Sequence, residues 1–262
     1  MRKETRTFIL LILLGAGTPG LLRADEKPAQ RHEVVLMVLY GNFGAYPRSD
    51  DRLASAQYYL AVGSTLKLFG EAGSSTRFGR TDFPFGAGAY WKAGQKDYLY
   101  AYLLFAVNPA VVANADLTAE YTRVLVKALT GSLGYRIMIF PRETVHVVIP
   151  ALDLYAIPRW TITGRAYLST LASASSVQTA FLARAAYDWS DRFTTIVTAS
   201  AGSEAYRAGS LQDFGTSHSW SGGIGLKIQL SGSFRLRAGY DYIRRSGVFK
   251  EHQLTLSTSY MW

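Results

Sequence analysis

The chain has 262 residues, of which 48% are hydrophobic and 18% charged, so it is neither a disordered polymer nor too short to fold. It has no cysteine, which excludes a disulfide framework, a thiolate metal site, a cysteine nucleophile and a lipoprotein anchor. The formal net charge is +9, which fits a soluble surface, affinity for a membrane surface or an anionic partner.

Residues 1–24 have the pattern of a secretory signal peptide. A basic start with Arg2, Lys3 and Arg6 precedes a short apolar run at 8–17, and the stretch ends in the small residue Ala24. The apolar run is too short to cross a bilayer as a helix. We therefore expect cleavage near Ala24, a short periplasmic segment at 25–31, and a mature protein that leaves the cytoplasm without a transmembrane helix and without a nucleic-acid partner.

Residues 32–262 are predicted to form one outer-membrane β-barrel. They divide into segments of about ten residues separated by turn residues, the length that a transmembrane strand needs. We predict an all-β, transmembrane, up-and-down antiparallel barrel of about 14 strands, with about 12 possible if weakly patterned segments merge. The expected strands are 33–43, 53–62, 65–78, 82–92, 97–107, 118–128, 132–141, 144–155, 160–170, 177–188, 193–203, 218–230, 233–244 and 249–262.

Connections between these segments alternate between longer and shorter through much of the chain. The longer set is 44–52, 108–117, 171–176 and 204–216, and the shorter set is GST, AGQK, LTG, IPR, SDR and SGS. Barrels have long outer loops and short periplasmic turns, so both termini are expected in the periplasm. The connections at 79–81, 142–143 and 245–248 are also short and fall on the outer side, so the alternation is incomplete.

The tryptophans give a second indication of a membrane barrel. Trp91, Trp160, Trp189 and Trp262 lie at predicted periplasmic strand ends, and Trp220 lies near an outer end. Tryptophan prefers the headgroup level of a membrane, with its ring in apolar surroundings and its N–H near water. These five residues are therefore expected to form aromatic girdles.

The last strand has a strict apolar and polar alternation. Leu254, Leu256, Thr258, Tyr260 and Trp262 share one face. Such a strand ending in an aromatic residue is typical of outer-membrane barrels and serves as their assembly signal, although Ser257 stands where glycine is often found. We expect the barrel assembly machinery and outer-membrane lipid to be partners of the protein.

Alternation in the other strands separates apolar from charged residues. Arginine or lysine facing lipid at the membrane midplane would cost about 2–4 kcal/mol, so the charged face is placed inside. The expected lumen-lining basic residues are Lys67, Arg77, Arg123, Lys127, Arg136, Arg165, Arg184, Lys227, Arg235 and Arg237, and the acidic counter-charges are Glu71, Asp188 and Asp241. Near Pro150 we expect a bulge, because proline cannot donate to the ladder.

Catalytic chemistry has little support in the sequence. Barrel hydrolases and acyltransferases place histidine and serine two apart on one strand face, and none of His32, His146, His218 and His252 has such a partner. His218 is flanked by serines that would face the other way, and His146 is expected among lumen groups. No metal-ligand spacing or nucleotide fingerprint occurs. We expect no catalytic residue, cofactor or metal, while an outer-membrane enzyme stays open as a remote alternative.

Several stretches together resemble the YaiO family of outer-membrane β-barrel proteins. They are STRFGRTD (75–82), DYLYAYLLFAVNPA (97–110), GSLGYRIMIF (131–140) and YAIPRWTITGRAYLST (155–170). The resemblance extends over roughly 32–262 and implies a barrel in the outer membrane of a Gram-negative-type bacterium. It implies no catalytic residue and no ligand.

Two functional readings remain. The first is a pore or transport barrel whose basic lumen admits anionic or sugar-like solutes, because lumen charges attract counter-ions. The second is a structural or surface-interaction barrel that is plugged by ion pairs and acts through its extracellular loops.

Overall fold

The computed structural model describes residues 32–43, 50–77, 79–110, 112–141, 143–173, 177–203, 218–245 and 249–262. The predicted signal peptide, the segment 25–31 and most of the loops 44–52 and 204–216 lie outside the described residues. Within the described part, no helix is long and apolar enough to cross a membrane.

The described chain is built from antiparallel strands. They are β1 (His32–Asn42), β2 (Asp50–Val62), β3 (Leu66–Arg77), β4 (Arg80–Asp82), β5 (Phe85–Lys92), β6 (Asp97–Phe105), β7 (Ala115–Val126), β8 (Leu129–Phe140), β9 (Glu143–Leu154), β10 (Trp160–Leu171), β11 (Val177–Ser190), β12 (Phe193–Ser203), β13 (His218–Gln229), β14 (Phe234–Arg245) and β15 (Phe249–Met261).

β4 and β5 act as one barrel strand. Both pair with β3 in the same register, with Ser75 opposite Asp82 and Ala72 opposite Phe85. The interruption falls at Phe83–Pro84, where the proline has no N–H to donate. The described residues therefore form a barrel of fourteen strands, which confirms the predicted architecture.

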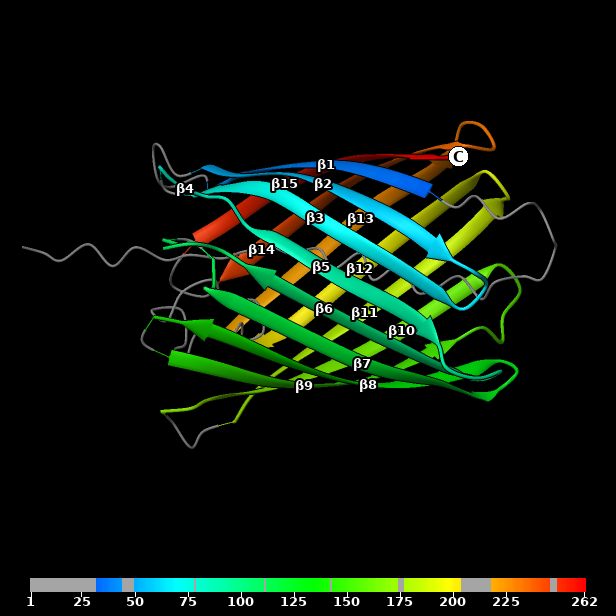
Figure 1. Ribbon diagram of the computed structural model, residues 1–262, viewed down its shortest axis with the longest axis horizontal. Helices are drawn as coiled ribbons and strands as arrows, with labels where there is room; N and C mark the ends of the chain where they lie inside the picture. Colours follow the sequence, from blue (N-terminus) through cyan, green and yellow to red (C-terminus); the bar gives the residue numbers. More distant parts are fainter. Residues whose placement is uncertain are drawn as a thin grey trace, which may run out of the picture.

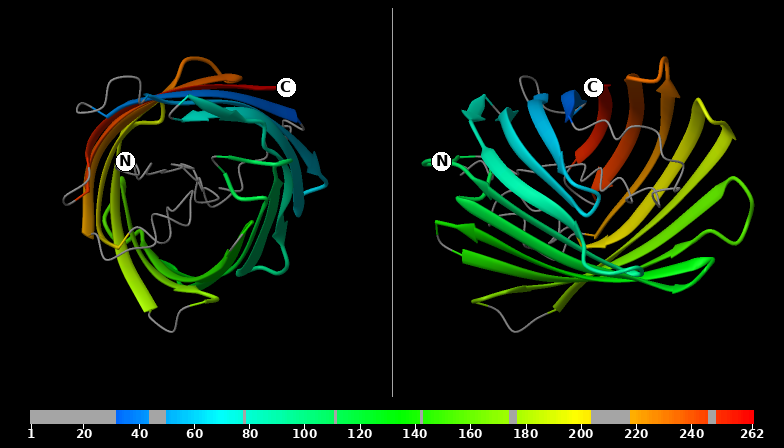
Figure 2. Two further views of the ribbon diagram at one scale, coloured as in Figure 1. Left: turned by 90° about the vertical axis from the view of Figure 1, so that its left-hand side faces the viewer. Right: turned by 45° about the vertical axis from the view of Figure 1, so that its right-hand side comes forward.

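The sheet closes on itself. Each strand pairs with its neighbours in the sequence, and β1 pairs with both β2 and β15, so the first and last strands complete the ring. Figure 1 shows β1 beside β15 at the seam, and the end-on view in Figure 2 shows the tilted strands arranged in a ring. Closure removes every exposed sheet edge, which a membrane-spanning sheet requires.

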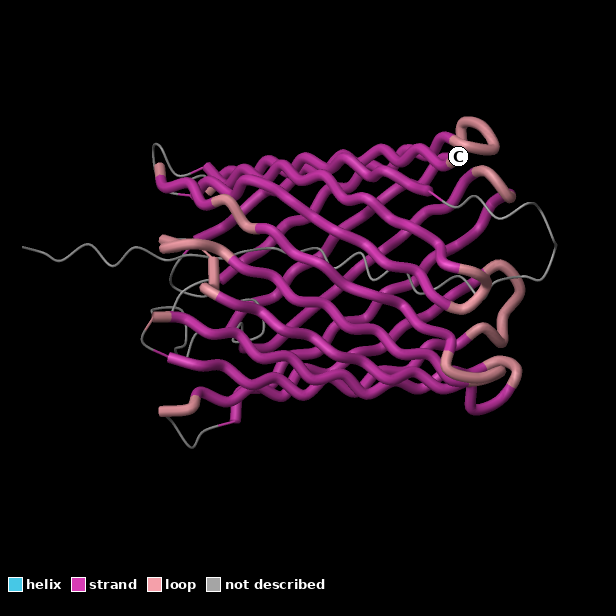
Figure 3. The backbone as a smooth tube through the Cα atoms, viewed as in Figure 1, coloured by secondary structure: helices cyan, strands magenta, loops and turns pink. Residues whose placement is uncertain are grey.

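The position of the C-terminus identifies the two ends of the barrel. The chain ends at the same end as the turn 63–65 between β2 and β3 (Figure 1), and Figure 3 shows the connections gathered at both ends of the strands. Gly63 has φ +64°, a left-handed conformation that favours glycine in this tight turn. By the convention of outer-membrane barrels, the end with Trp262 is called periplasmic below.

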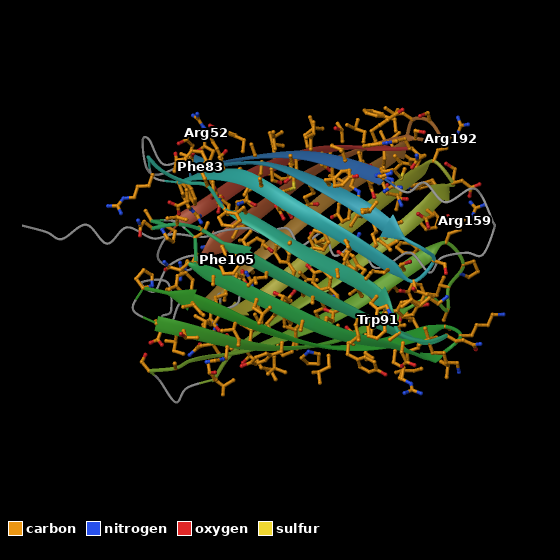
Figure 4. The ribbon with its side chains drawn as sticks, viewed as in Figure 1. Arg52, Phe83, Trp91, Phe105, Arg159 and Arg192 are labelled. Atoms are coloured by element: carbon orange, nitrogen blue, oxygen red, sulfur yellow. The ribbon has the colours of Figure 1, made fainter. Side chains whose placement is uncertain are left out.

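The outer face of the strands is apolar. Leu36, Val38, Leu133, Phe181 and Leu254 are examples of large side chains that are exposed there. In Figure 4, Phe83 and Phe105 lie toward one end of the barrel and Trp91 lies toward the other. Outward charged residues of the described strands lie within four residues of a strand end, where contact with lipid costs little. This face is suited to a bilayer.

The prediction of a β-bulge at Pro150 is wrong. Pro150 lies opposite Leu133 in β8 without a register shift. On the β10 side, pairing is interrupted between Ala151 and Val148 but resumes in the same register. The missing N–H therefore removes a ladder bond without inserting a residue. Register shifts occur instead near the periplasmic ends of β7 and β11, at Val124/Val126 and Asp188/Ser190.

Candidate functional site

The candidate site is the interior of the barrel. Contacts between strands that are not neighbours identify the inward face, since the convex outer face cannot bring such side chains together. Arg165 on β10 contacts Glu120 on β7 at 3.1 Å, and Lys67 on β3 contacts Glu33 on β1 at 2.9 Å. Directly paired residues share a face, so the strand registers extend this inward face around the barrel.

Four of the predicted basic residues face the lumen and form ion pairs there with three carboxylates. Arg136 holds Asp116 with two hydrogen bonds, one of them 2.8 Å from Nε to Oδ1. Arg165 holds Glu120 with 3.1 Å and 3.4 Å bonds from its terminal nitrogens. Lys67 and Arg235 share Glu33, at 2.9 Å and 3.8 Å respectively. These pairs fit the reading in which ion pairs fill the barrel.

Arg77 also faces inward but is sealed from solvent. Its side chain has 0% exposure and lies 3.9 Å from Asp51 and 3.7 Å from Glu251. The guanidinium also covers the ring of Phe43, with 4.8 Å to the ring centroid. Arg77 therefore joins β2, β3 and β15 on both sides of the seam near the outer end, and it cannot meet a solute.

Three predicted basic residues differ from these pairs. Among the described residues, no carboxylate oxygen lies within ion-pair distance of Arg184, Lys227 or Arg237. They come from β11, β13 and β14, and Lys227 is directly opposite Arg237. Lys227 interacts electrostatically with the carboxylate of Asp188, which attracts it, and with Arg235, Arg237 and Arg184, which repel it. We call Arg184, Lys227 and Arg237 the cation wall; it concentrates positive charge in the periplasmic half of the lumen.

Two residues that were predicted to line the lumen, Arg123 and Lys127, do not lie there. Arg123 lies on the outer face near the periplasmic end of β7, 3.7 Å from Asp97, and Lys127 lies exposed in the turn after β7. The signal was present in the alternation, because Leu117 and Tyr121 share the face of Arg123. Near a strand end, the charged head reaches water from the outer face, so the lipid penalty does not force it inward.

The predicted acidic residues face the lumen, but they are not the main counter-charges. Glu71 accepts hydrogen bonds from Tyr102 at 2.8 Å and Gln57 at 3.0 Å. Asp188 and Asp241 accept bonds from the hydroxyls of Thr194 and Thr198. The inward-facing carboxylates that pair with cations are Glu33, Asp116, Glu120, Asp51 and Glu251, which are not among the predicted counter-charges.

An aromatic surface on the inward face was not predicted. Tyr59, Phe69, Tyr90, Tyr100 and Tyr102, called the aromatic wall below, come from β2, β3, β5 and β6. Their rings surround Phe69 at centroid distances of 5.2 to 6.3 Å. Gly88 makes this possible, because a Cβ there would lie 2.4 Å from the Phe69 ring. Alternation in the tyrosine-rich β6 could have revealed the surface.

The tryptophans lie on the outer face near the strand ends. Trp91, Trp160, Trp189, Trp220 and Trp262 are all exposed, as expected for girdle residues. The indole N–H of Trp189 donates to Thr195 at 2.9 Å. Trp262 stacks on His32 across the β1–β15 seam, with ring centroids 5.5 Å apart.

Three of the four histidines are hydrogen-bonded to tyrosines. His32, His146 and His252 each share a 2.6–2.7 Å hydrogen bond with a tyrosine hydroxyl of a neighbouring strand. The prediction that His146 lies in the lumen is wrong, because it occupies the outer face of β9 beside Tyr135. Among the described residues, no group of three or more histidines and carboxylates could hold a metal ion.

The C-terminal strand has the predicted faces. Leu254, Leu256, Tyr260 and Trp262 are exposed on the outer face, and Thr258 shares it. The backbone N–H groups of His32 and Trp262 donate to each other's carbonyl at 3.1 Å, which completes the ladder between β1 and β15. The proposed assembly signal is thus also the closing edge of the barrel.

Comparison with known proteins identifies the sequence family and the fold. The family model described as the YaiO membrane beta barrel domain matches residues 35–207, more than half of the chain. Among curated protein sequences, none matches this chain significantly.

Solved outer-membrane barrels share the architecture at low sequence identity. A bacterial polysaccharide outer-membrane secretin is 12% identical, with a TM-score of 0.56 and coverage of 89% of this chain and 99% of that one. The CymD monoaromatic hydrocarbon channel is 7% identical, with a TM-score of 0.56 and 88% coverage of both chains. Omp33 of Acinetobacter baumannii is 11% identical, with a TM-score of 0.53 and coverage of 89% and 98%. These similarities concern the fold.

Proposed function

The chain belongs to the YaiO family of membrane β-barrel proteins, and we propose that it is a channel for anionic or sugar-like solutes across the outer membrane. The observation that carries this proposal is the cation wall, whose three side chains have no carboxylate partner among the described residues. Charges that only stabilise a plugged interior would be expected to be paired, as Arg136 and Arg165 are.

The position of the cation wall supports a role in solute passage. Arg237 is exposed, and Arg184 and Lys227 are half-buried, although all three point inward. Like charges repel one another, so holding them together costs free energy unless water or an anion is present. In a lumen with low-dielectric walls, their field raises the local concentration of anions.

Conductance in a planar bilayer tests the proposal. The barrel, refolded in detergent and inserted under a salt gradient, should show steps whose reversal potential indicates anion preference. The variant with Arg184→Gln, Lys227→Gln and Arg237→Gln should lose most of that preference, because these residues are lumen cations without a carboxylate at ion-pair distance among the described residues.

A matched variant separates lumen charge from overall charge. Arg244→Gln removes one positive charge from the exposed outer face of β14 and should leave the reversal potential unchanged. A folded barrel that conducts without anion preference, or that never conducts, would contradict the proposal.

The alternative of a plugged structural or surface-interaction barrel is favoured by a different observation. On β8 and β9, Met138, Phe140, Val145, Val147 and Ile149 face inward and form a buried apolar cluster with Ala113 of the loop before β7. This cluster fills part of the outer half of the lumen. Absence of conductance in a correctly folded barrel would favour this alternative.

Export and assembly belong to the same proposal. Residues 1–24 would direct export of the chain and be removed, and β15 would be the segment that the barrel assembly machinery recognises. The outward alternation of Leu254, Leu256 and Tyr260 supports contact with lipid after insertion.

A further inference from the structure

We infer that the periplasmic half of the lumen binds acidic oligosaccharides, with the cation wall holding their carboxylates and the aromatic wall packing against their sugar rings. This inference rests on the proposed channel function and names its solute class. The observation behind it is that the cation wall and the aromatic wall, which differ in chemistry, lie in the same section of the barrel.

The two walls lie at the same end of the barrel. Lys227 is two residues from the periplasmic end of β13, and Arg237 is three residues from that end of β14. Tyr59 and Tyr90 are likewise three and two residues from the periplasmic ends of β2 and β5. Arg237 interacts electrostatically with Tyr59 and Glu33, so the walls are near each other across the seam.

The aromatic wall has groups suited to a sugar. Phe69 and Tyr102 are buried, but Tyr59, Tyr90 and Tyr100 are only half-buried. Among the described residues, the hydroxyls of Tyr90 and Tyr100 have no hydrogen-bond partner, whereas those of Tyr59 and Tyr102 donate to Gln57 and Glu71. The wall therefore offers ring surface and two free hydroxyls at the same place.

Charge beside the aromatic wall is partly compensated locally. The ammonium of Lys67 lies 4.3 Å from the centroid of the Tyr59 ring and is paired with Glu33. Glu33 also contacts Arg235, so one carboxylate is shared by two cations between the walls, and this group keeps one positive charge. The cation wall adds three cations that have no carboxylate within ion-pair distance among the described residues, although Lys227 also interacts electrostatically with Asp188.

This combination selects among solute classes. An apolar solute would gain nothing from three unpaired cations, and a small inorganic anion would gain nothing from the aromatic rings. A uronic-acid oligomer carries a carboxylate on each ring, which arginine can bind with two parallel bonds. Its C–H faces can pack on tyrosine rings, and its hydroxyls can bond to Tyr90 and Tyr100. An acidic oligosaccharide uses both walls at once.

Binding to the folded barrel tests the inference directly. Isothermal titration calorimetry with the detergent-folded protein would compare a short linear oligouronate, a neutral malto-oligosaccharide of equal length and a linear polyphosphate of equal charge. The oligouronate should bind at least about tenfold more tightly than either comparator, because only it engages both walls.

Substitutions in the aromatic wall test whether the oligouronate binds there. Replacing Tyr90 and Tyr100 with leucine should weaken oligouronate binding about tenfold and leave polyphosphate binding unchanged, since two ring contacts are lost. Tyr40→Leu removes an exposed tyrosine from the outer face of β1 and should change neither affinity. Heat-dependent gel migration would establish that each variant is folded.

The outcomes separate this inference from the proposed function. Equal binding of oligouronate and polyphosphate, with no effect of the tyrosine changes, would overturn the inference while leaving an anion-preferring channel intact. A barrel that binds oligouronate as expected but does not conduct would overturn the channel proposal and retain the binding site.

Discussion

At the scale of single residues, the basic side chains of the interior differ in what surrounds them. Arg136 has Asp116 within reach, and Arg165 has Glu120. Arg237, by contrast, is opposite Lys227 and Ser257 on its two neighbouring strands. The same residue type thus forms a close ion pair in one part of the barrel and has no carboxylate at ion-pair distance, among the described residues, in another.

Arg77 provides a prediction about stability. Arg77→Leu leaves Asp51 and Glu251 buried without their cation, which should lower the free energy of unfolding by about 3–5 kcal/mol. Urea unfolding in lipid vesicles, followed by tryptophan fluorescence, would measure the change. Arg52→Gln removes a cation that is exposed beside Asp50, and its effect should stay below about 1 kcal/mol. Equal losses in the two variants would contradict the role of Arg77 as a clamp.

At the scale of elements, β4 fixes the loop between β6 and β7. The carboxylate of Asp82, at the end of β4, accepts bonds from the backbone N–H of Ala110 at 2.9 and 3.0 Å and of Val112 at 2.9 Å. Val112 and Ala113 are buried, and Ala113 packs with inward-facing residues of β8 and β9. Asp82 therefore holds the loop over the outer half of the lumen.

Removal of this carboxylate should release the loop. Asp82→Ala deprives the two N–H groups of a charged acceptor, and bonds of this kind contribute about 1.5–3 kcal/mol each. Amide hydrogen exchange at Ala110 and Val112 should accelerate, while exchange in β8 should not change. Asp50→Ala, which removes a half-buried carboxylate paired with Arg52, serves as the comparison. Unchanged exchange in Asp82→Ala would show that the loop is held by its apolar contacts instead.

Sequence periodicity predicted the elements better than the site. Each expected strand occurs, because a membrane barrel repeats one local rule: about ten residues alternating in polarity between turns. The rule could not show that Asp51 and Glu251 converge on Arg77, since these residues are far apart in sequence and meet only when the ring closes. The rule also failed for Arg123. Near a strand end, a charged side chain on the outer face reaches water, so the cost of contact with lipid does not force it inward.

At the scale of the whole molecule, consecutive residues of a strand face opposite sides of the barrel wall, one toward lipid and the next toward the lumen. In β15, Leu256 is exposed on the outer face, and the next residue, Ser257, lies opposite Arg237 on the inner face. Alternation alone does not say which face is inside; closure of the sheet within a bilayer decides it. Because the chain has no cysteine, one introduced thiol reports on one position.

Thiol labelling at these two positions tests both the faces and the field of the lumen. A fluorophore on Leu256→Cys should be quenched by lipid-borne quenchers, and one on Ser257→Cys should not. With water-soluble reagents of equal size, Ser257→Cys should react faster with an anionic reagent than with a cationic one, because Lys227 and Arg237 attract the anion. Added salt should reduce this difference by screening. Quenching at 257 would invert the face assignment, and equal rates for the two reagents would mean that the cation wall does not control the charge in the lumen.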